Sequence, residues 1–397
     1  MTGTDNAQKT FYVTSPIYYV SGQPHIGTAY TTIACDVLAR YQRLRGREVV
    51  FATGTDEHGQ KVVRGAANAG MSPQDFVDGL VADYKRAWER LHVEYSRFIR
   101  TTEPEHTQLV QRVFTRLVAS DDIYKAEYTG WYCIPCETYL LEQDLADGNC
   151  PECGRPTEQV SQEAYFFRTS KYADALLRHI EEHEEFIGPE SRRNEVTAFI
   201  KSGLRDSCVS RTRSDWDIPV PGDEGQSIYV WFDALINYVT AIGYGEDDER
   251  FRRWWSNSHH IISKDILRFN CVYWPAMLLA AGERPATQVH VHGFLLVGGE
   301  KMSKSGLNQI APADLVEGDA ERGFAALGVD GFRYHFLRDV TFGPEGNLYV
   351  PSQDTNIVGR YFGPNAPDGT RGQPMPHPVL AREKRARVGV NLGYVAP

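Results

Sequence analysis

The feature that most constrains this chain is an apolar strand pattern that breaks at glycine and proline and then becomes a helical pattern. Thr10 to Val20 is rich in β-branched and aromatic residues, and Ile26 to Arg45 places apolar residues at helical spacing. The stretch "REVVFATGTDEHG" starts the alternation again, with a strand over Val49 to Ala52. Strands that alternate with helices predict an α/β fold with a parallel sheet, whose ligands bind beyond the carboxyl ends of the strands.

The composition along the chain predicts how this fold is divided. Residues 71–125 have a helical pattern, and from Gly130 to about Arg168 the sequence changes to Cys, Gly, Pro and short aromatic runs, as in a small β-rich insertion. Strand and helix patterns then return, so the insertion splits one nucleotide-binding fold. The predicted ranges are 1–125 for the first half, 126–215 for the insertion, 216–300 for the second half, 301–350 for a lysine-bearing loop and its continuation, and 351–397 for a flexible Pro/Gly-rich tail.

Bulk properties exclude several classes of protein. The chain has 397 residues, 42% of them hydrophobic, which is enough for more than one core. The polar start "MTGTDNAQKT" and the lack of an apolar run near the roughly 18 residues of a membrane span predict a cytoplasmic protein without a membrane partner. A formal charge of -10 argues against nonspecific coating of nucleic acid, which depends on Lys and Arg.

Four of the seven cysteines form two Cys-x-x-Cys pairs within the Gly/Pro-rich insertion. The spacing C-x2-C-x13-C-x2-C is typical of a structural Zn²⁺ site with four thiolate ligands. The alternative is a set of buried cysteines without a metal. The predicted ligands are Cys133, Cys136, Cys150 and Cys153.

Two further segments have features of an anion site. His25 stands at the break between the first strand and helix, beside Gly27, where a helix N-terminus gathers backbone N–H groups. Lys301 and Lys304 lie in a Gly- and Ser-rich loop that suits clamping and releasing a polyphosphate. Taken singly, the His25 segment is more readily a histidine that caps a turn, and the lysine loop is more readily a solvated surface loop.

The two segments together resemble a known family. "PHIG" at 24–27 and "KMSKS" at 301–305 resemble the two signatures of class I aminoacyl-tRNA synthetases, and the sequence between them resembles the methionyl-tRNA synthetases. The resemblance covers roughly Phe11 to Gly346. It is carried by "TSPIYYVSGQPHIG", "TGTDEHGQK", "GWYCIPCETYLLE", "FIKSGLRDSCVSRT", "DWDIPVPGD", "YVWFDALINY", "KDILRF" and "YWPAM".

The resemblance implies a Rossmann-type parallel sheet split by a zinc-binding connective insertion, and ATP-dependent formation of methionyl-adenylate followed by charging of tRNA. Mg²⁺ would accompany ATP, and the insertion would lie near the tRNA acceptor stem. The implied ATP-binding residues are Pro24, His25, Gly27, Thr28, Lys301, Met302, Ser303, Lys304 and Ser305. Of these, His25, Gly27, Thr28, Lys301 and Lys304 would stabilise the charge that develops on the phosphates.

The resemblance also implies an amino-acid site. Asp56 matches the carboxylate that binds the substrate ammonium, although "GTDEHG" alone is equally typical of an Asx turn. The apolar and aromatic residues implied to bind the side chain would suit a thioether, whereas sequence alone would place them in a core. They are Ile17, Tyr19, Trp231, Ala234, Leu235, Tyr238, Ile266 and Trp274, and Asn270 is implied at the edge of the same site.

The sequence departs from the family pattern within the expected site. Thr28 replaces the second histidine of the first signature, Ser263 replaces a glycine, and Asn270 replaces a histidine. "SGLN" replaces the usual order after the lysines, and a Pro/Gly-rich tail stands where the family continues into a helical bundle that reads the anticodon. Two alternatives follow: a paralogue that adenylates methionine or a related amino acid for another acceptor, and a non-catalytic binding protein. Retention of His25 and both lysines favours an enzyme.

Overall fold

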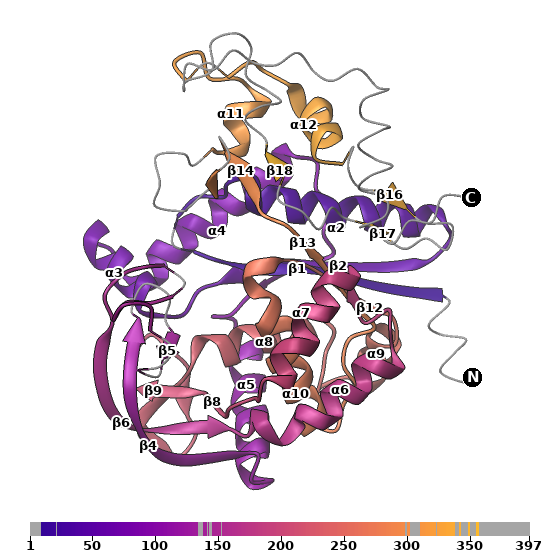
Figure 1. The fold of residues 1–397 in the computed structure, drawn as a ribbon. Helices are drawn as coiled ribbons and strands as arrows, with labels where there is room; N and C mark the ends of the chain where they lie inside the picture. The colour runs from indigo at the N-terminus through magenta and orange to yellow at the C-terminus, as the bar shows by residue number, and fades with distance from the viewer. Residues whose placement is uncertain are drawn as a thin grey trace.

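The structure, a computed structural model, describes residues 9–20, 22–133, 138–140, 142, 145–151, 153–297, 300–301, 310–322, 324–337, 341–342, 348–349 and 355–356. Its centre is a six-stranded sheet in the order β3-β2-β1-β12-β13-β7. Every neighbouring pair in it is parallel. The α/β fold with a parallel sheet is therefore confirmed (Figure 1).

The strands of this sheet come from both halves of the chain. They are β1 (Thr10–Tyr19), β2 (Glu48–Asp56), β3 (Arg97–Arg100), β7 (Ile187–Gly188), β12 (Ser258–Ser263) and β13 (Gln288–His292). Helix α2 (Ile26–Leu44) connects β1 to β2, and helices α3 (Gln60–Ala69) and α4 (Pro73–Arg90) connect β2 to β3. The predicted strand from Thr10 and helix from Ile26 thus form as expected.

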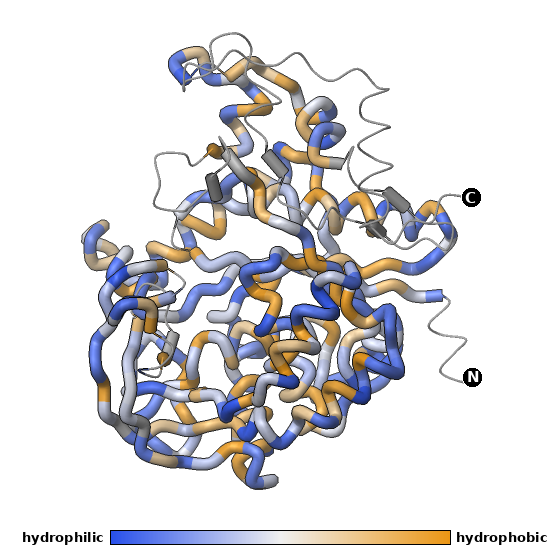
Figure 2. Tube along the Cα trace, in the orientation of Figure 1, coloured by the Kyte–Doolittle hydropathy of each residue, from blue (hydrophilic) through white to orange (hydrophobic). Residues whose placement is uncertain are grey.

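The sheet separates two hydrophobic cores, because alternate residues of β1 point to opposite faces. Phe11 and Val13 pack with α2 and α4 on one face, while Tyr12 packs on the other. That second face is covered by α5 (Pro104–Ala119), α8 (Val230–Thr240) and α10 (Trp274–Ala280), which Figure 1 shows beneath the sheet. Figure 2 shows hydrophobic residues gathered in this lower layer and hydrophilic residues along the outer edge of the molecule.

The prediction of helix throughout 71–125 is wrong at β3. This strand has only four residues, "RFIR", and stands between two helices, so its period-2 pattern is too short to be recognised. Its pairing with β2 is close at Gly54, where an added Cβ would lie 2.1 Å from the carbonyl oxygen of Ile99. β2 and β3 can therefore approach this closely only because residue 54 is a glycine.

The insertion contains a four-stranded antiparallel sheet in the order β5-β4-β6-β8. Its strands are β4 (Ile123–Cys133), β5 (Thr138–Leu140), β6 (Glu158–Phe167) and β8 (Ser207–Cys208). The range predicted for the insertion, 126–215, also holds α6 (Ala173–Glu182), α7 (Glu190–Lys201) and β7. Since β7 pairs with β13, part of this range belongs to the main sheet.

A carboxylate buried in α2 anchors the described C-terminal helices. Asp36 is fully buried and accepts hydrogen bonds from Arg40 Nε at 3.0 Å and from Arg333 Nη2 at 2.5 Å. Arg333 belongs to α12 (Gly328–Leu337), which follows α11 (Pro312–Val316). The ring of Phe336 on α12 lies 5.7 Å from the ring of Tyr30 on α2. Helix α12 is thereby packed against α2, the helix that His25 caps.

Candidate active site

The N-terminus of α2 is closed by His25. Its backbone is extended (φ -121, ψ 170), and its Nδ1 atom accepts the Gly27 N–H at 3.1 Å. Because Nδ1 acts as an acceptor, the neutral ring carries its hydrogen on Nε2. Pro24 is buried, whereas His25 and Gly27 are partly exposed. The histidine therefore caps the helix and also presents a potential donor at its end.

Thr28 completes this cap. Its Oγ1 atom accepts the His25 N–H at 3.1 Å and donates to the His25 carbonyl oxygen at 2.7 Å. The side chain is buried. The N–H of Ile26 donates to the carbonyl oxygen of Ile310 at 3.0 Å. In this conformation the Thr28 hydroxyl and the Ile26 and Gly27 amides all bind protein atoms.

The segment that carries the lysines begins and ends at this turn. His292, the last residue of β13, lies 2.8 Å from Thr31 Oγ1 through Nε2 and donates from Nδ1 to the Gly293 carbonyl oxygen at 2.8 Å. At the other end, Ile310 accepts from Ile26. Between them, β14 (Leu295–Val297) pairs with β15 (Glu300–Lys301), and the Lys301 backbone lies opposite Leu296. Met302, Ser303, Lys304 and Ser305 lie outside the described residues.

Asp56 lies at the carboxyl end of β2. Its side chain is 5% exposed, and its carbonyl oxygen accepts the Val20 N–H at 3.1 Å. Tyr19 is its register partner on β1, and Ile17 pairs with Gly54. Ile17 packs with the core beneath the sheet, whereas Tyr19 packs with the core on the α2 face. These residues meet at one end of two neighbouring strands, where a parallel sheet places its ligands.

Four of the expected side-chain-binding residues lie on α8, and a π-helical turn over Phe269–Tyr273 packs against it. The Trp231 ring stacks on Phe269 with centroids 3.9 Å apart. Tyr238 donates its hydroxyl hydrogen to Asn270 Oδ1 at 2.8 Å, and Asn270 Nδ2 donates to the Ile266 carbonyl oxygen at 3.1 Å. The π turn, a feature frequent at functional sites, brings Asn270 to α8. Ala234 and Leu235 are buried on the same helix.

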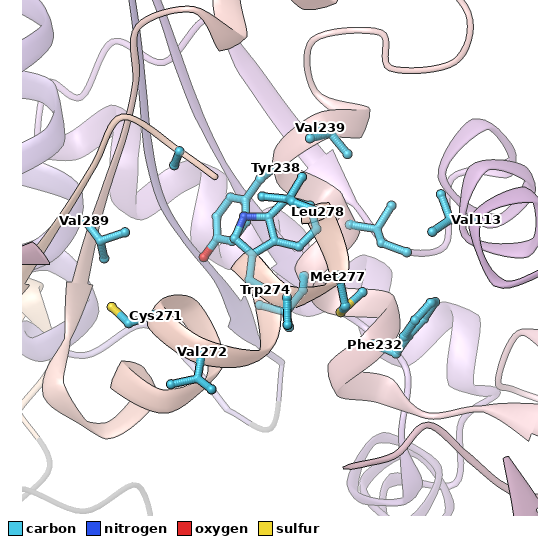
Figure 3. Packing of buried hydrophobic residues seen from close by; sticks show 14 of the residues in the cluster. Val113, Phe232, Tyr238, Val239, Cys271, Val272, Trp274, Met277, Leu278 and Val289 are labelled. Carbon is cyan, nitrogen blue, oxygen red and sulfur yellow. The ribbon is translucent and has the colours of Figure 1, made fainter. Parts of the chain in front are cut away.

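Trp274 occupies the interior of the core under these residues. It is 3% exposed, and its ring centroid lies 5.9 Å from that of Tyr238. Figure 3 shows both rings among Met277, Leu278 and Val239. Phe269 was not among the residues expected in the site, although it directly precedes Asn270 in "LRFN". The structure adds it through its stacking on Trp231.

Asp233 on α8 forms a polar network that was not among the features predicted from the sequence. Its Oδ2 lies 2.7 Å from His58 Nδ1, and its Oδ1 lies 2.7 Å from His106 Nε2. Burial alone would raise the pKa of Asp233, but the two histidines lower it below its ordinary value. Burial alone would lower the pKa of His58, but the Asp233 carboxylate outweighs it, so the net change is upward.

Three of the predicted zinc ligands are brought together. The sulfur atoms of Cys133, Cys150 and Cys153 lie within 4.8 Å of one another, and those of Cys133 and Cys153 are 3.6 Å apart. Zn–S bonds of about 2.3 Å in a tetrahedron give sulfur separations of about 3.8 Å, so the arrangement fits zinc. The turn closes through the Gly154 N–H to the Cys150 carbonyl oxygen at 2.8 Å. Cys136 lies outside the described residues.

This constellation, a parallel sheet with a histidine-capped helix beside a lysine-bearing segment, defines the class I synthetase catalytic fold. A family model described as tRNA synthetases class I (M) matches residues 11–162 and 155–350. The chain belongs to this family, the methionyl-tRNA synthetases of class I. Among the described residues, none of the helices has the length and apolar character needed to cross a membrane.

Relatives support the assignment. A methionine–tRNA ligase of Caldanaerobacter subterraneus is 51% identical over 340 residues, which are 85% of this chain and 52% of that protein. One of Streptomyces coelicolor is 43% identical over 397 residues, covering 93% of this chain and 72% of that protein. The chain thus spans about half the length of the first relatives it matches.

Solved structures agree. Mycobacterium tuberculosis methionyl-tRNA synthetase in complex with methionyl-adenylate superposes with a TM-score of 0.80 at 42% identity, covering 88% of this chain and 66% of that one. The apo form of that protein gives a TM-score of 0.70 at 37% identity, covering 85% of this chain and 64% of that one.

Proposed function

We propose that the chain activates methionine with ATP to form methionyl-adenylate and transfers the methionyl group to tRNA. The observation that carries this proposal is the position of the lysine segment. Its two ends contact the N-terminal turns of α2, through His292 on Thr31 and through Ile310 on Ile26. We propose that Lys301 and Lys304 reach phosphates that are bound at this helix N-terminus beside His25. Relatives named methionine–tRNA ligase support the same activity.

In the proposed reaction, a carboxylate oxygen of methionine attacks the α-phosphorus of ATP. The bond from that phosphorus to the bridging oxygen of the β-phosphate breaks, and pyrophosphate leaves. His25 donates from Nε2 to a phosphate oxygen, and Lys301 and Lys304 neutralise the departing pyrophosphate. Mg²⁺, where it accompanies ATP, would supply further positive charge to offset that of the departing pyrophosphate, beside Lys301 and Lys304. Gly27 allows the phosphates to approach the helix end, with Pro24 and residues 302–305 completing the ATP site.

At the amino-acid end, Asp56 holds the substrate ammonium, and the residues of α8 and the π turn surround the side chain. The rings of Trp231, Phe269 and Tyr238 offer edges that attract a thioether sulfur. The Tyr238 hydroxyl donates to Asn270 in this structure, so Asn270 acts on the substrate through the position of Tyr238. Ile17, Tyr19, Ala234, Leu235, Ile266 and Trp274 complete this part of the proposal.

We also propose a structural Zn²⁺ bound by Cys133, Cys136, Cys150 and Cys153, in an insertion that lies near the tRNA acceptor stem. We assign the protein to the cytoplasm, because two Cys-x-x-Cys pairs suit a metal site in a reducing compartment better than a disulfide framework. The expected metal content is one zinc per chain. Chelation should increase amide hydrogen exchange in the described residues between 130 and 168, whereas full activity at zero zinc would contradict the assignment.

The activity is tested by amino-acid-dependent exchange of labelled pyrophosphate into ATP, over a panel of amino acids, followed by charging of tRNA. Methionine should support the fastest exchange, and the methionyl group should appear on tRNA. Absence of exchange with every amino acid would refute the proposal and leave a non-catalytic binding protein. The matched control is the double Lys301→Ala, Lys304→Ala chain, in which exchange should fall while folding is retained.

A second candidate function is adenylation of methionine or a related amino acid for an acceptor other than tRNA. Thr28 and Asn270 favour it, because both depart from the family pattern and both have their polar atoms bound within the protein. Exchange without tRNA charging would favour this candidate. Asn270→His should shift the preference of exchange toward methionine, and an unchanged preference would remove Asn270 from the argument for selectivity.

A further inference from the structure

Asp233 joins three elements through its two carboxylate oxygens. His58 comes from the loop after β2, His106 from α5, and Asp233 itself from α8. Both carboxylate contacts are 2.7 Å long, and the second nitrogen of His106 lies 2.8 Å from Thr240 Oγ1. All four side chains are buried. The proposed reaction uses none of these residues.

A buried carboxylate is stable only when its oxygens keep good hydrogen bonds. Movement of any of the three elements would lengthen at least one contact and leave charge uncompensated. The network therefore resists changes in the separation of the His58 loop and α8. It acts as a fixed link between them, in addition to filling the space between α5 and α8.

The link connects the two halves of the amino-acid site. His58 follows Asp56 by two residues, and Asp233 lies between Trp231 and Ala234. The neighbours of His58 are bound elsewhere. Glu57 forms a bidentate ion pair with Arg100 at 2.8 and 2.9 Å, and the Gly59 N–H donates to Asp217 Oδ1 at 2.8 Å. His58 is thus the residue of this loop that reaches α8.

We propose that Asp233, through His58, is a positioning residue that sets the separation between Asp56 and the side chains of α8. The substrate ammonium and side chain are then recognised together, so the network determines the KM for methionine. This inference rests on the proposed function, because it assigns Asp56 to the ammonium. Neither Asp233 nor His58 touches the substrate in this account.

The test compares two amides at position 58. The amide nitrogen of Asn takes the place of His Nδ1, whereas Gln is one methylene longer and displaces the donor. In pyrophosphate exchange, His58→Gln should raise the KM for methionine about 10-fold or more, because it weakens binding that the bound substrate and the transition state share. The KM for ATP and kcat should remain near wild type. His58→Asn should restore the KM for methionine to within about 3-fold of wild type.

The matched control is His106→Leu, which breaks the other contact of the same carboxylate but lies on α5, outside the Asp56 loop. It should lower thermal stability with little change in the KM for methionine. Equal KM effects from His106→Leu and His58→Gln, or a wild-type KM in His58→Gln, would overturn the inference. If His58→Gln does not fold, Asp233→Glu and Asp233→Asn provide the same comparison of length, with a raised KM expected for Glu alone.

Failure of the inference is distinguishable from failure of the proposed function. A wild-type chain that supports no exchange with any amino acid refutes the function. A wild-type chain that exchanges with methionine, together with a His58→Gln chain of unchanged KM, refutes the positioning role alone.

Discussion

The two ends of the candidate active site are built differently. At the phosphate end, the first turn of α2 combines contacts within the turn, such as Thr28 Oγ1 with the backbone of His25, three residues away, with a neutral backbone hydrogen bond from Ile26 to Ile310. At the amino-acid end, residues 57–59 are held by partners from distant parts of the chain. His58 binds Asp233, which is 175 residues away, and Gly59 binds Asp217, which is 158 residues away.

At the phosphate end, a bound phosphate can replace contacts that the protein makes with itself. At the amino-acid end, the contacts are fixed before any substrate binds. The amides of Ile26 and Gly27 bind an Ile310 carbonyl oxygen and a histidine nitrogen, both of which a phosphate oxygen can replace with little loss. The contacts of residues 57–59 are buried and charged, so breaking them is costly. Removal of a donor to the phosphates should therefore appear in the rate, whereas loss of a buried contact of residues 57–59 should appear first in stability.

The largest expected effect is at His25. Asn is a good N-cap, so His25→Asn keeps a helix cap while removing the Nε2 donor. Loss of one donor to a developing negative charge costs about 100- to 1,000-fold in rate. Pyrophosphate exchange should fall by this factor, while the free energy of unfolding in urea changes by less than about 0.5 kcal/mol. A rate within about 3-fold of wild type would remove His25 from the chemistry.

Substitution of Glu57, in contrast to that of His25, should act first on stability. Its fully buried carboxylate binds Arg100 twice and accepts from Thr102 Oγ1 at 2.6 Å. Glu57→Gln leaves the guanidinium partly uncompensated and should lower the free energy of unfolding by about 3 kcal/mol. The matched control is Glu48→Gln, which breaks an exposed pair with Arg253 and should cost less than about 0.5 kcal/mol. Equal urea midpoints for the two variants would contradict a preorganised loop.

Substitutions of Thr28 test whether its hydroxyl caps the helix or binds a phosphate. Because its hydroxyl hydrogen is donated to the His25 carbonyl oxygen, Thr28→Ala should lower the free energy of unfolding by about 1 kcal/mol and leave the exchange rate within about 3-fold. Thr28→Ser, which retains the hydroxyl, should match wild type in both measurements. A loss of about 100-fold in exchange for Thr28→Ala would show that the hydroxyl turns to the phosphates during the reaction.

The local parts of the fold were predictable from sequence, since their signals lie within one window. The strand from Thr10 and the helix from Ile26 carry clear periods of about 2 and 3.6 residues, and the cysteine spacing predicts a cluster of thiols, three of which lie together among the described residues. β3 and β7 were missed because runs of four and two residues carry too little periodicity. Their place in the sheet comes from pairing with β2 and β13.

The Asp233 network was missed for a different reason. His58 and His106 reach the same carboxylate over sequence separations of 175 and 127 residues, and neither separation has a signature. "YVWFDALINYV" predicts an apolar helix, in which Asp233 is the single charged residue and Asn237, one turn further on, is also polar. A charged residue in a largely apolar helix is the signal that could have identified the buried contact.

The smallest expected effect is the pH dependence of stability that His58 contributes. It tests whether the contacts at the amino-acid end are charged, unlike those at the phosphate end. Burial would lower the pKa of His58, but Asp233, with Asp217 and Glu57 nearby, raises it above its ordinary value. The folded chain therefore binds this proton more tightly than the unfolded chain. The stabilisation is complete below about pH 6.5 and is lost as the pH rises through the folded pKa, by about 1.4 kcal/mol for each pH unit that separates the unfolded pKa from the folded one.

The buried histidines of β12 and β13 change the stability with pH in the opposite direction. Burial lowers the pKa of His260 to about 3 and that of His290 to about 4, so the unfolded chain binds these protons more readily and stability falls below about pH 6.5. Urea unfolding from about pH 5 to about pH 8 should therefore show an acid and an alkaline decline. This range lies below that in which the thiols of Cys35, Cys208 and Cys271, whose pKa values burial raises, would ionise in the unfolded chain. His58→Asn should abolish the alkaline decline and leave the acid one. If both declines persist unchanged in that variant, then His58 is not charged in the folded protein and the loop is held by neutral hydrogen bonds alone.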